Sequence, residues 1–143
     1  MNDRFKFRAW DRERKLLIYS WSESTTEQRK IYEDVYGKDE TYNCWQCCQL
    51  DCLDNYGENF IIEQCTGLKD KNGKLIYEGD VVEVSEAYEN GIYKIEFCQS
   101  DCEYNLYNTE GNFMYQLTKS MARYMEVIGN IHENADLIKV GRK

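Results

Sequence analysis

The sequence predicts an α+β protein that is mainly β: an N-terminal hairpin and a short helix, followed by a small SH3-like β-barrel. Two observations carry this prediction. In the second half of the chain, short β-branched and aromatic runs alternate with glycine-centred turn signals, at the spacing that small barrels produce. Residues 25–36 show the four-residue periodicity of an amphipathic helix. We expect an N-terminal region with an irregular cysteine-rich end over residues 1–58, and the barrel with a C-terminal tail over residues 59–143.

The N-terminal region is expected to begin with two strands. Residues 5–10 alternate in character, which is typical of a half-buried amphipathic edge strand. Its two faces would carry Phe5, Phe7 and Ala9 on one side, and Lys6, Arg8 and Trp10 on the other. Residues 16–21 form the expected return strand of the hairpin. Ser24 and Glu27 match a capping box, so the helix is expected to start beside them, and Gly37 is suited to end it.

Three turn signals divide the second half of the chain. Asp70-Lys71-Asn72-Gly73 and Asn90-Gly91 favour tight hairpins, because an Asn-Gly pair accepts positive φ. Glu78-Gly79-Asp80 marks a corner. Residues 113–125 are expected to form a strand and then a helical turn. The other strands expected around these turns cover residues 59–64, 74–77, 81–87, 92–97, 103–107 and 125–131.

The chain is acidic, with 26 Asp and Glu against 18 Lys and Arg and a formal net charge of −8. A negatively charged protein repels the negatively charged phosphate backbone of nucleic acid, so nucleic acid is not an expected partner. The same charge leaves one alternative open, an acidic inhibitor of a host nucleic-acid-acting protein. No apolar run approaches the roughly 20 residues that span a bilayer, and the N-terminus lacks a signal-peptide pattern. We therefore expect a cytoplasmic protein with no membrane partner.

Seven cysteines form the only constellation with the spacing of metal ligands. Zinc takes four thiolate or imidazole ligands, which a chain usually supplies as two closely spaced pairs. Such pairs are Cys44-x-x-Cys47 and Cys98-x-x-x-Cys102, so the candidate zinc ligands are Cys44, Cys47, Cys98 and Cys102. The alternative is a set of small reduced thiols, buried or half-exposed, with no cofactor.

The other side chains with catalytic potential form no recognisable constellation. His132 is the only histidine, so any His-dependent nucleophile would rely on it alone. Asp70, Glu78 and Asp80 flank the two strongest turns, where acidic residues usually bond to the turn backbone. A metal-assisted hydrolase on these three carboxylates is the enzymatic alternative. No glycine loop suited to phosphate is present, and we expect no enzyme.

Three segments of the chain resemble the YopX family of phage and prophage proteins. They are FRAWD at residues 7–11, TGLKDKNGKLIYEGDVVEV at 66–84 and EVIGNIHEN at 126–134. The resemblance implies a phage-derived protein in the cytoplasm of a bacterial host, a β-rich fold with helical elements, and self-association. It supplies no catalytic residues, because the family has no assigned activity. In the family pattern the last segment continues with Pro, an acidic residue and Leu, whereas this chain has Asn134-Ala135-Asp136-Leu137.

The function expected from these observations is that of a non-enzymatic binding or assembly module. Its partner would be a second copy of itself, or a phage or host protein. Twelve tyrosines support this expectation, because tyrosine buries a large ring at an interface while its hydroxyl keeps a polar partner.

Overall fold

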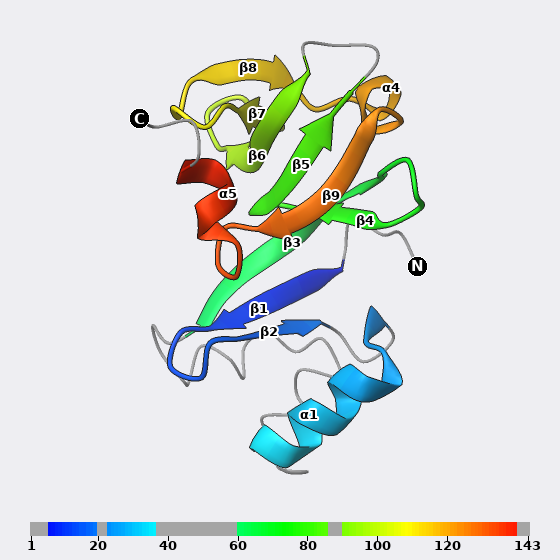
Figure 1. Cartoon of the computed structure of the whole chain (residues 1–143), viewed down its shortest axis with the longest axis vertical. Coiled ribbons are helices and arrows are strands. Elements are labelled where there is room, and N and C mark those ends of the chain that lie inside the picture. The colour runs from blue at the N-terminus through cyan, green and yellow to red at the C-terminus, as the bar shows by residue number, and fades with distance from the viewer. Residues whose placement is uncertain (1–5, 20–22, 37–59, 86–89, 140–143) are drawn as a thin grey trace. The chain divides into compact units, whose positions relative to one another are not determined.

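The computed structural model describes residues 6–19, 23–36, 60–85 and 90–139, and these are mostly β (Figure 1). The chain divides into two compact units, an N-terminal unit of residues 6–63 and a C-terminal unit of residues 64–143. Strand β3 (Phe60–Lys69) begins in the first unit and ends in the second. None of the helices in the described ranges is long and apolar enough to cross a membrane.

In the N-terminal unit, β1 (Phe7–Asp11) pairs antiparallel with β2 (Leu16–Tyr19). β1 lies between β2 and β3 in the sheet, so the prediction that it is a half-buried edge strand is wrong. Arg8, Ala9, Trp10 and Asp11 are all buried, although their side chains alternate between the two faces. A central strand buried on both faces loses the alternation of exposure that the edge-strand prediction assumed.

Helix α1 (Thr26–Tyr36) starts with a capping box one residue later than the sequence pattern indicates. The backbone N–H of Gln28 donates to Thr25 Oγ1 at 3.1 Å, and the backbone N–H of Thr25 donates to Gln28 Oε1 at 2.8 Å. The hydroxyl of Ser24 instead donates to the carbonyl of Tyr19, the last residue of β2. Glutamine can replace glutamate in this motif, which explains the shift by one position.

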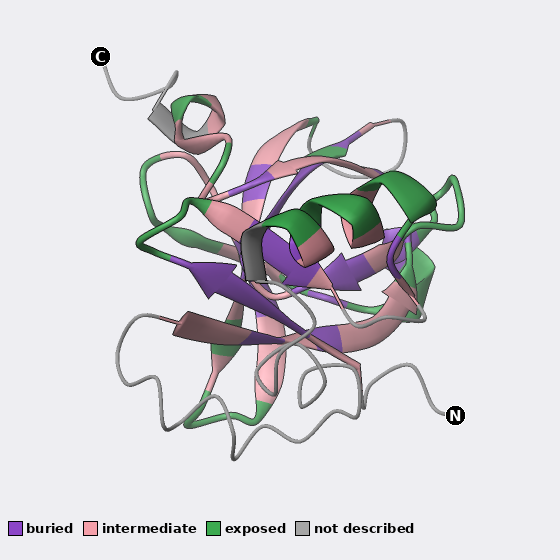
Figure 2. Ribbon diagram, turned by 90° about the horizontal axis from the view of Figure 1, so that it is seen from below, coloured by how far each residue is buried: buried purple, intermediate pink, exposed green. Residues whose placement is uncertain are grey.

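α1 contributes one buried ring to the core of the N-terminal unit. Tyr32 packs with Ala9 and Ile18, and its hydroxyl donates to the carbonyl of Leu17 at 3.1 Å. The opposite side of the helix is exposed (Figure 2). Ile31, expected in the apolar stripe, is 47% exposed. The exposure of Ile31 thus departs from the amphipathic periodicity of the helix.

In the C-terminal unit, the end of β3 pairs with β4 (Leu75–Tyr77), and a five-stranded antiparallel sheet curls around a second core. The order of that sheet is β8-β7-β6-β5-β9. Helix α4 (Lys119–Ala122) connects β8 to β9. Helix α5 (Ala135–Lys139), which the sequence did not predict, follows β9. The bounds of the sheet strands are β5 (Asp80–Val84), β6 (Gly91–Cys98), β7 (Glu103–Tyr107), β8 (Phe113–Gln116) and β9 (Met125–Asn130).

The core of the C-terminal unit is made by alternate residues of the sheet together with α4. Its fully buried members include Val82, Ile95, Leu106, Met121 and Met125. The corner before β5 depends on Gly79, whose φ of +86° lies in the region that side chains disfavour. The backbone N–H of Gly79 donates to the carbonyl of Ile95 at 2.8 Å, so the corner is anchored to the neighbouring strand.

Candidate functional site

The first candidate carboxylate, Asp70, closes the turn between β3 and β4. Its side chain is buried, and Oδ1 accepts hydrogen bonds from the backbone N–H groups of Asn72 and Lys74, each at 2.9 Å. Oδ2 accepts from the backbone N–H of Val127 in β9, also at 2.9 Å. One carboxylate therefore shapes the turn and ties it to a strand 57 residues further along the chain.

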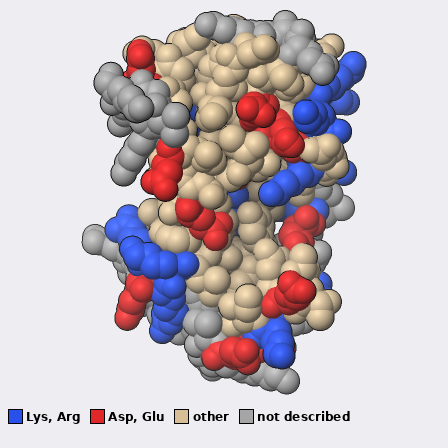
Figure 3. Space-filling model, viewed as in Figure 1, with Lys and Arg blue, Asp and Glu red and all other residues tan. Residues whose placement is uncertain are grey.

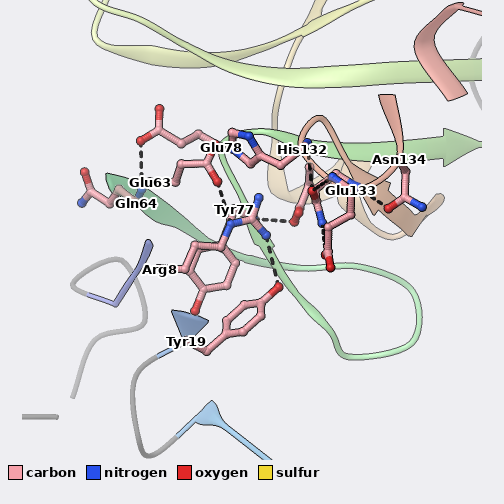
Figure 4. Close-up of polar contacts among 11 residues, drawn as sticks. Arg8, Tyr19, Glu63, Gln64, Tyr77, Glu78, His132, Glu133 and Asn134 are labelled. Carbon is pink, nitrogen blue, oxygen red and sulfur yellow. Dashed lines mark hydrogen bonds and ion pairs between the residues drawn. The ribbon is translucent and has the colours of Figure 1, made fainter. Parts of the chain in front are cut away.

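The other two candidate carboxylates serve the corner between β4 and β5. Glu78 Oε1 accepts from the backbone N–H of Gln64 at 2.8 Å (Figure 4), and Asp80 Oδ2 accepts from the backbone N–H of Tyr77 at 2.8 Å. Among the described residues, no group of three or more His, Cys, Asp or Glu side chains could hold a metal ion. The geometry gives Asp70, Glu78 and Asp80 structural partners and does not join them around one ion.

The segment after β9 forms a second polar turn, which lies beside the same corner. The backbone N–H of Ile131 donates to the carbonyl of Gly79 at 2.8 Å. Asn130 Oδ1 accepts from the backbone N–H groups of His132 and Glu133 at 3.0 and 2.8 Å, and its Nδ2 donates to Glu133 Oε1 at 2.8 Å (Figure 4). The single histidine thus enters this network through its backbone, and its side chain is half-buried.

Only two of the four candidate zinc ligands lie in the described part of the chain. Cys98 ends β6 and Cys102 lies in the turn before β7, and both are free thiols. Cys44 and Cys47 lie outside the described residues, so the structure does not relate the two pairs. The zinc site remains a prediction, and elemental analysis of protein purified without chelators tests it.

An aromatic pair at the turn end of the β6–β7 hairpin is an exposed feature that the sequence did not single out. Phe97 and Tyr104 are directly opposite in the register, with ring centroids 5.1 Å apart in an edge-to-face arrangement. Phe97 shares its face of the sheet with the buried Ile95, yet it is 43% exposed. Alternation alone predicts a buried Phe97. Its position at the end of the strand leaves it beyond the cover of the core.

Tyr104 stands in an acidic, partly desolvated environment. Burial above all, together with the negative charges of Glu78 and Cys65, raises the pKa of its hydroxyl to about 12. The hydroxyl is therefore neutral at all physiological pH values and can donate a hydrogen bond. The Phe97–Tyr104 pair thus combines an exposed ring with a polar group, as interface aromatics commonly do.

The raised pKa predicts a loss of stability in strong alkali. The unfolded chain loses this proton near pH 10, whereas the folded protein keeps it until about pH 12. The contribution of Tyr104 to the free energy of unfolding is therefore fully present below pH 10 and is lost as the pH rises towards 12. Tyr104→Phe should remove this part of the pH dependence, measured by denaturant unfolding across the range, with Tyr124→Phe as the control. Identical pH profiles for Tyr104→Phe and the native protein would contradict the assignment.

In the N-terminal unit, the sequence also missed a buried ion pair. Arg8 Nε donates to Glu63 Oε1 at 2.8 Å, and the two side chains are 1% and 6% exposed (Figure 4). The guanidinium also donates to Tyr19 Oη at 3.3 Å, with its carbon 5.9 Å from the centre of that ring. No local pattern links residues 8 and 63, because β3 brings the carboxylate to β1 only in the folded chain.

These features define a class of protein, a small and mostly β protein. The carboxylates of Asp70, Glu78 and Asp80 accept hydrogen bonds from backbone amides, and an aromatic pair lies at the end of a hairpin. The chain belongs to the YopX family, since the family model described as YopX protein matches residues 6–139. The resemblance inferred from the three sequence segments is therefore confirmed.

Two solved structures are similar over nearly the whole chain. Protein EF1440 from Enterococcus faecalis has 24% sequence identity and a TM-score of 0.47, with 93% of this chain and 96% of that chain covered. Protein YopX from Bacillus subtilis has 16% identity and a TM-score of 0.47, with 96% and 98% covered. No curated protein matches the sequence.

Proposed function

We propose that the chain is a non-enzymatic assembly module of phage or prophage origin, which binds copies of itself in the bacterial cytoplasm. The observation that carries this proposal is the 43% exposure of Phe97 beside Tyr104. A large ring that continues a buried core to the surface can bury further apolar area when a partner covers it. Aromatic side chains of this kind supply much of the binding energy at protein interfaces.

The proposal extends to the architecture of the C-terminal unit. We propose that the curled sheet of the C-terminal unit is a small SH3-like barrel. The strand order β8-β7-β6-β5-β9 supports this proposal, as four strands follow one another as a meander and the fifth returns to pair with the first. The short helix α4 before the last strand is a further support. Such a fold provides a scaffold for binding surfaces but does not specify a partner.

Replacing Phe97 by Ala should weaken self-association about tenfold or more, because a truncated interface aromatic removes both contact area and packing. Phe113→Ala is the matched control. Phe113 is 57% exposed and contacts Tyr107, which faces the opposite side of the sheet from Phe97. Sedimentation velocity over a concentration series measures the association of all three proteins. Equal association by Phe97→Ala and the native protein would exclude this surface, and a strictly monomeric native protein would refute self-association.

Salt separates self-association from the alternative of an acidic inhibitor. Each copy carries a formal charge of −8, so two copies repel and their association should strengthen as salt screens the charges. Binding to a basic host protein should weaken under the same change. On the face shown in Figure 3, acidic and basic side chains are interspersed, which gives the inhibitor no uniformly acidic surface there.

A further inference from the structure

We propose that Cys98 and Cys102 form a reactive dithiol that closes reversibly into a disulfide within the β6–β7 turn. This modification site is independent of the proposed function. Cys98 is directly opposite Glu103 in the register, so residues 99–102 make the turn, and Cys102 is its last residue. Directly opposed residues of a hairpin have Cα atoms about 4.5–5.5 Å apart. This spacing applies to Cys98 and Glu103, and Cys102 directly precedes Glu103 in the chain, so the turn brings the two cysteines to its two ends.

Both sulfur atoms lie against the residues that separate them. Cys98 Sγ is 3.4 Å from Ser100 Oγ and donates to Asp101 Oδ2 at 3.6 Å. Cys102 Sγ donates to the carbonyl of Gln99 at 3.6 Å. Neither thiol is part of the hydrophobic core. Both sulfurs therefore contact residues of this one turn.

The backbone of Cys102 supports a role for its side chain. Its φ of +54° lies in the left-handed region, which favours glycine and costs energy for a residue with a Cβ. The side chain of Cys102 is exposed, so packing does not compensate this cost. Cys98 is half-buried and the remaining described thiol, Cys65, is buried. A small oxidant can therefore reach the two turn thiols in preference to Cys65.

The oxidant we propose is a low-molecular-weight disulfide. The thiolate of the exposed Cys102 attacks one sulfur of that disulfide, its S–S bond breaks, and one thiolate leaves. The thiolate of Cys98 then attacks the Cys102 sulfur of the mixed disulfide and releases the second thiolate. Two protein thiols are oxidised and one small disulfide is reduced to two thiols. Because Phe97 directly precedes Cys98, the new bond would hold the end of the hairpin that carries the aromatic pair.

The sequence allows a direct test by mass spectrometry. Trypsin cuts after Lys94 and Lys119, and the peptide of residues 95–119 contains Cys98 and Cys102 and no other cysteine. The folded full-length protein is equilibrated with oxidised and reduced glutathione, quenched with an alkylating agent and digested. We expect this peptide to become lighter by two hydrogen atoms and to recover both alkylated thiols after reduction. Half-oxidation should need about tenfold less oxidised glutathione than for the same peptide free in solution, because the folded turn raises the effective concentration of the thiols.

Single substitutions provide the controls. Cys102→Ser and Cys98→Ser should each prevent the internal bond and leave at most a glutathione adduct, while Cys65→Ser should behave like the native protein. The proposal fails if the folded protein oxidises no more readily than the free peptide. It also fails if the peptide is recovered cross-linked to another segment of the chain, or with two separate glutathione adducts.

Discussion

Replacing Glu63 by Gln is expected to lower the free energy of unfolding of the N-terminal unit by about 3–5 kcal/mol. The amide keeps the shape of the side chain and an acceptor oxygen, but it removes the negative charge opposite Arg8. The guanidinium is 1% exposed and cannot regain water without opening the sheet. Removing the negative charge opposite a buried guanidinium is far more costly than the small net gain that the intact pair supplies.

The tryptophans make this measurement selective. All three precede residue 60 in the sequence and Trp10 is buried in β1, so tryptophan fluorescence during urea unfolding reports the N-terminal unit. Glu23→Gln is the matched control in the same unit, because it breaks the ion pair of Glu23 with Lys6, in which the two side chains are 26% and 20% exposed. Its effect should stay below about 1 kcal/mol.

A double variant distinguishes a buried charge from lost packing. Arg8→Met combined with Glu63→Leu removes both charges and should recover most of the stability lost by Glu63→Gln, as apolar side chains can replace a buried ion pair. Loss of less than about 1 kcal/mol in Glu63→Gln, or no recovery in the double variant, would show that the pair does not act as described.

Replacing Asp70 by Ala is expected to destabilise the C-terminal unit by about 3 kcal/mol. Three backbone N–H groups lose one shared acceptor, and of the bonds from the turn to β9 the one from the Lys71 N–H to the Met125 carbonyl, at 2.9 Å, remains. Hydrogen bonds to a charged group are worth about 1.5–3 kcal/mol each, but solvent can replace those of the exposed Asn72 and Lys74. The bond to Val127 should therefore account for most of the loss.

The variant Asp70→Asn tests whether the bond to Val127 accounts for most of the lost stability. The amide can keep its oxygen towards the turn, but its NH₂ group then faces the N–H of Val127, so the variant should lose the side-chain bond to β9 and retain the turn. Circular dichroism during thermal and urea unfolding measures both variants, with the exposed Glu110→Ala as a control expected within about 0.5 kcal/mol of the native protein. Equal stability of Asp70→Ala and Glu110→Ala would contradict the assigned role.

Strong local signals were sufficient for much of the C-terminal unit. The turn at Gly73, with a φ of +82°, and the corner at Gly79 adopt the conformations that their neighbouring residues predict. β7 covers the predicted residues 103–107, because its short β-rich run ends at a turn signal. The roles of Asp70 and Asp80 as turn acceptors also follow from local chemistry, since each bonds to backbone within four residues.

The amino-acid sequence by itself therefore determined the family, the mostly β composition and the turns at Gly73 and Gly79, because these depend on residues close together in the chain. The tight turn predicted at Asn90-Gly91 is wrong in its position, since Gly91 begins β6 without a positive φ. Only the tertiary structure decided that β1 is a central strand, that Arg8 meets Glu63 and that Phe97 emerges beside Tyr104. The physical reason is that burial and pairing depend on which strands become neighbours, and a periodicity of two is the same for an edge strand and a central one.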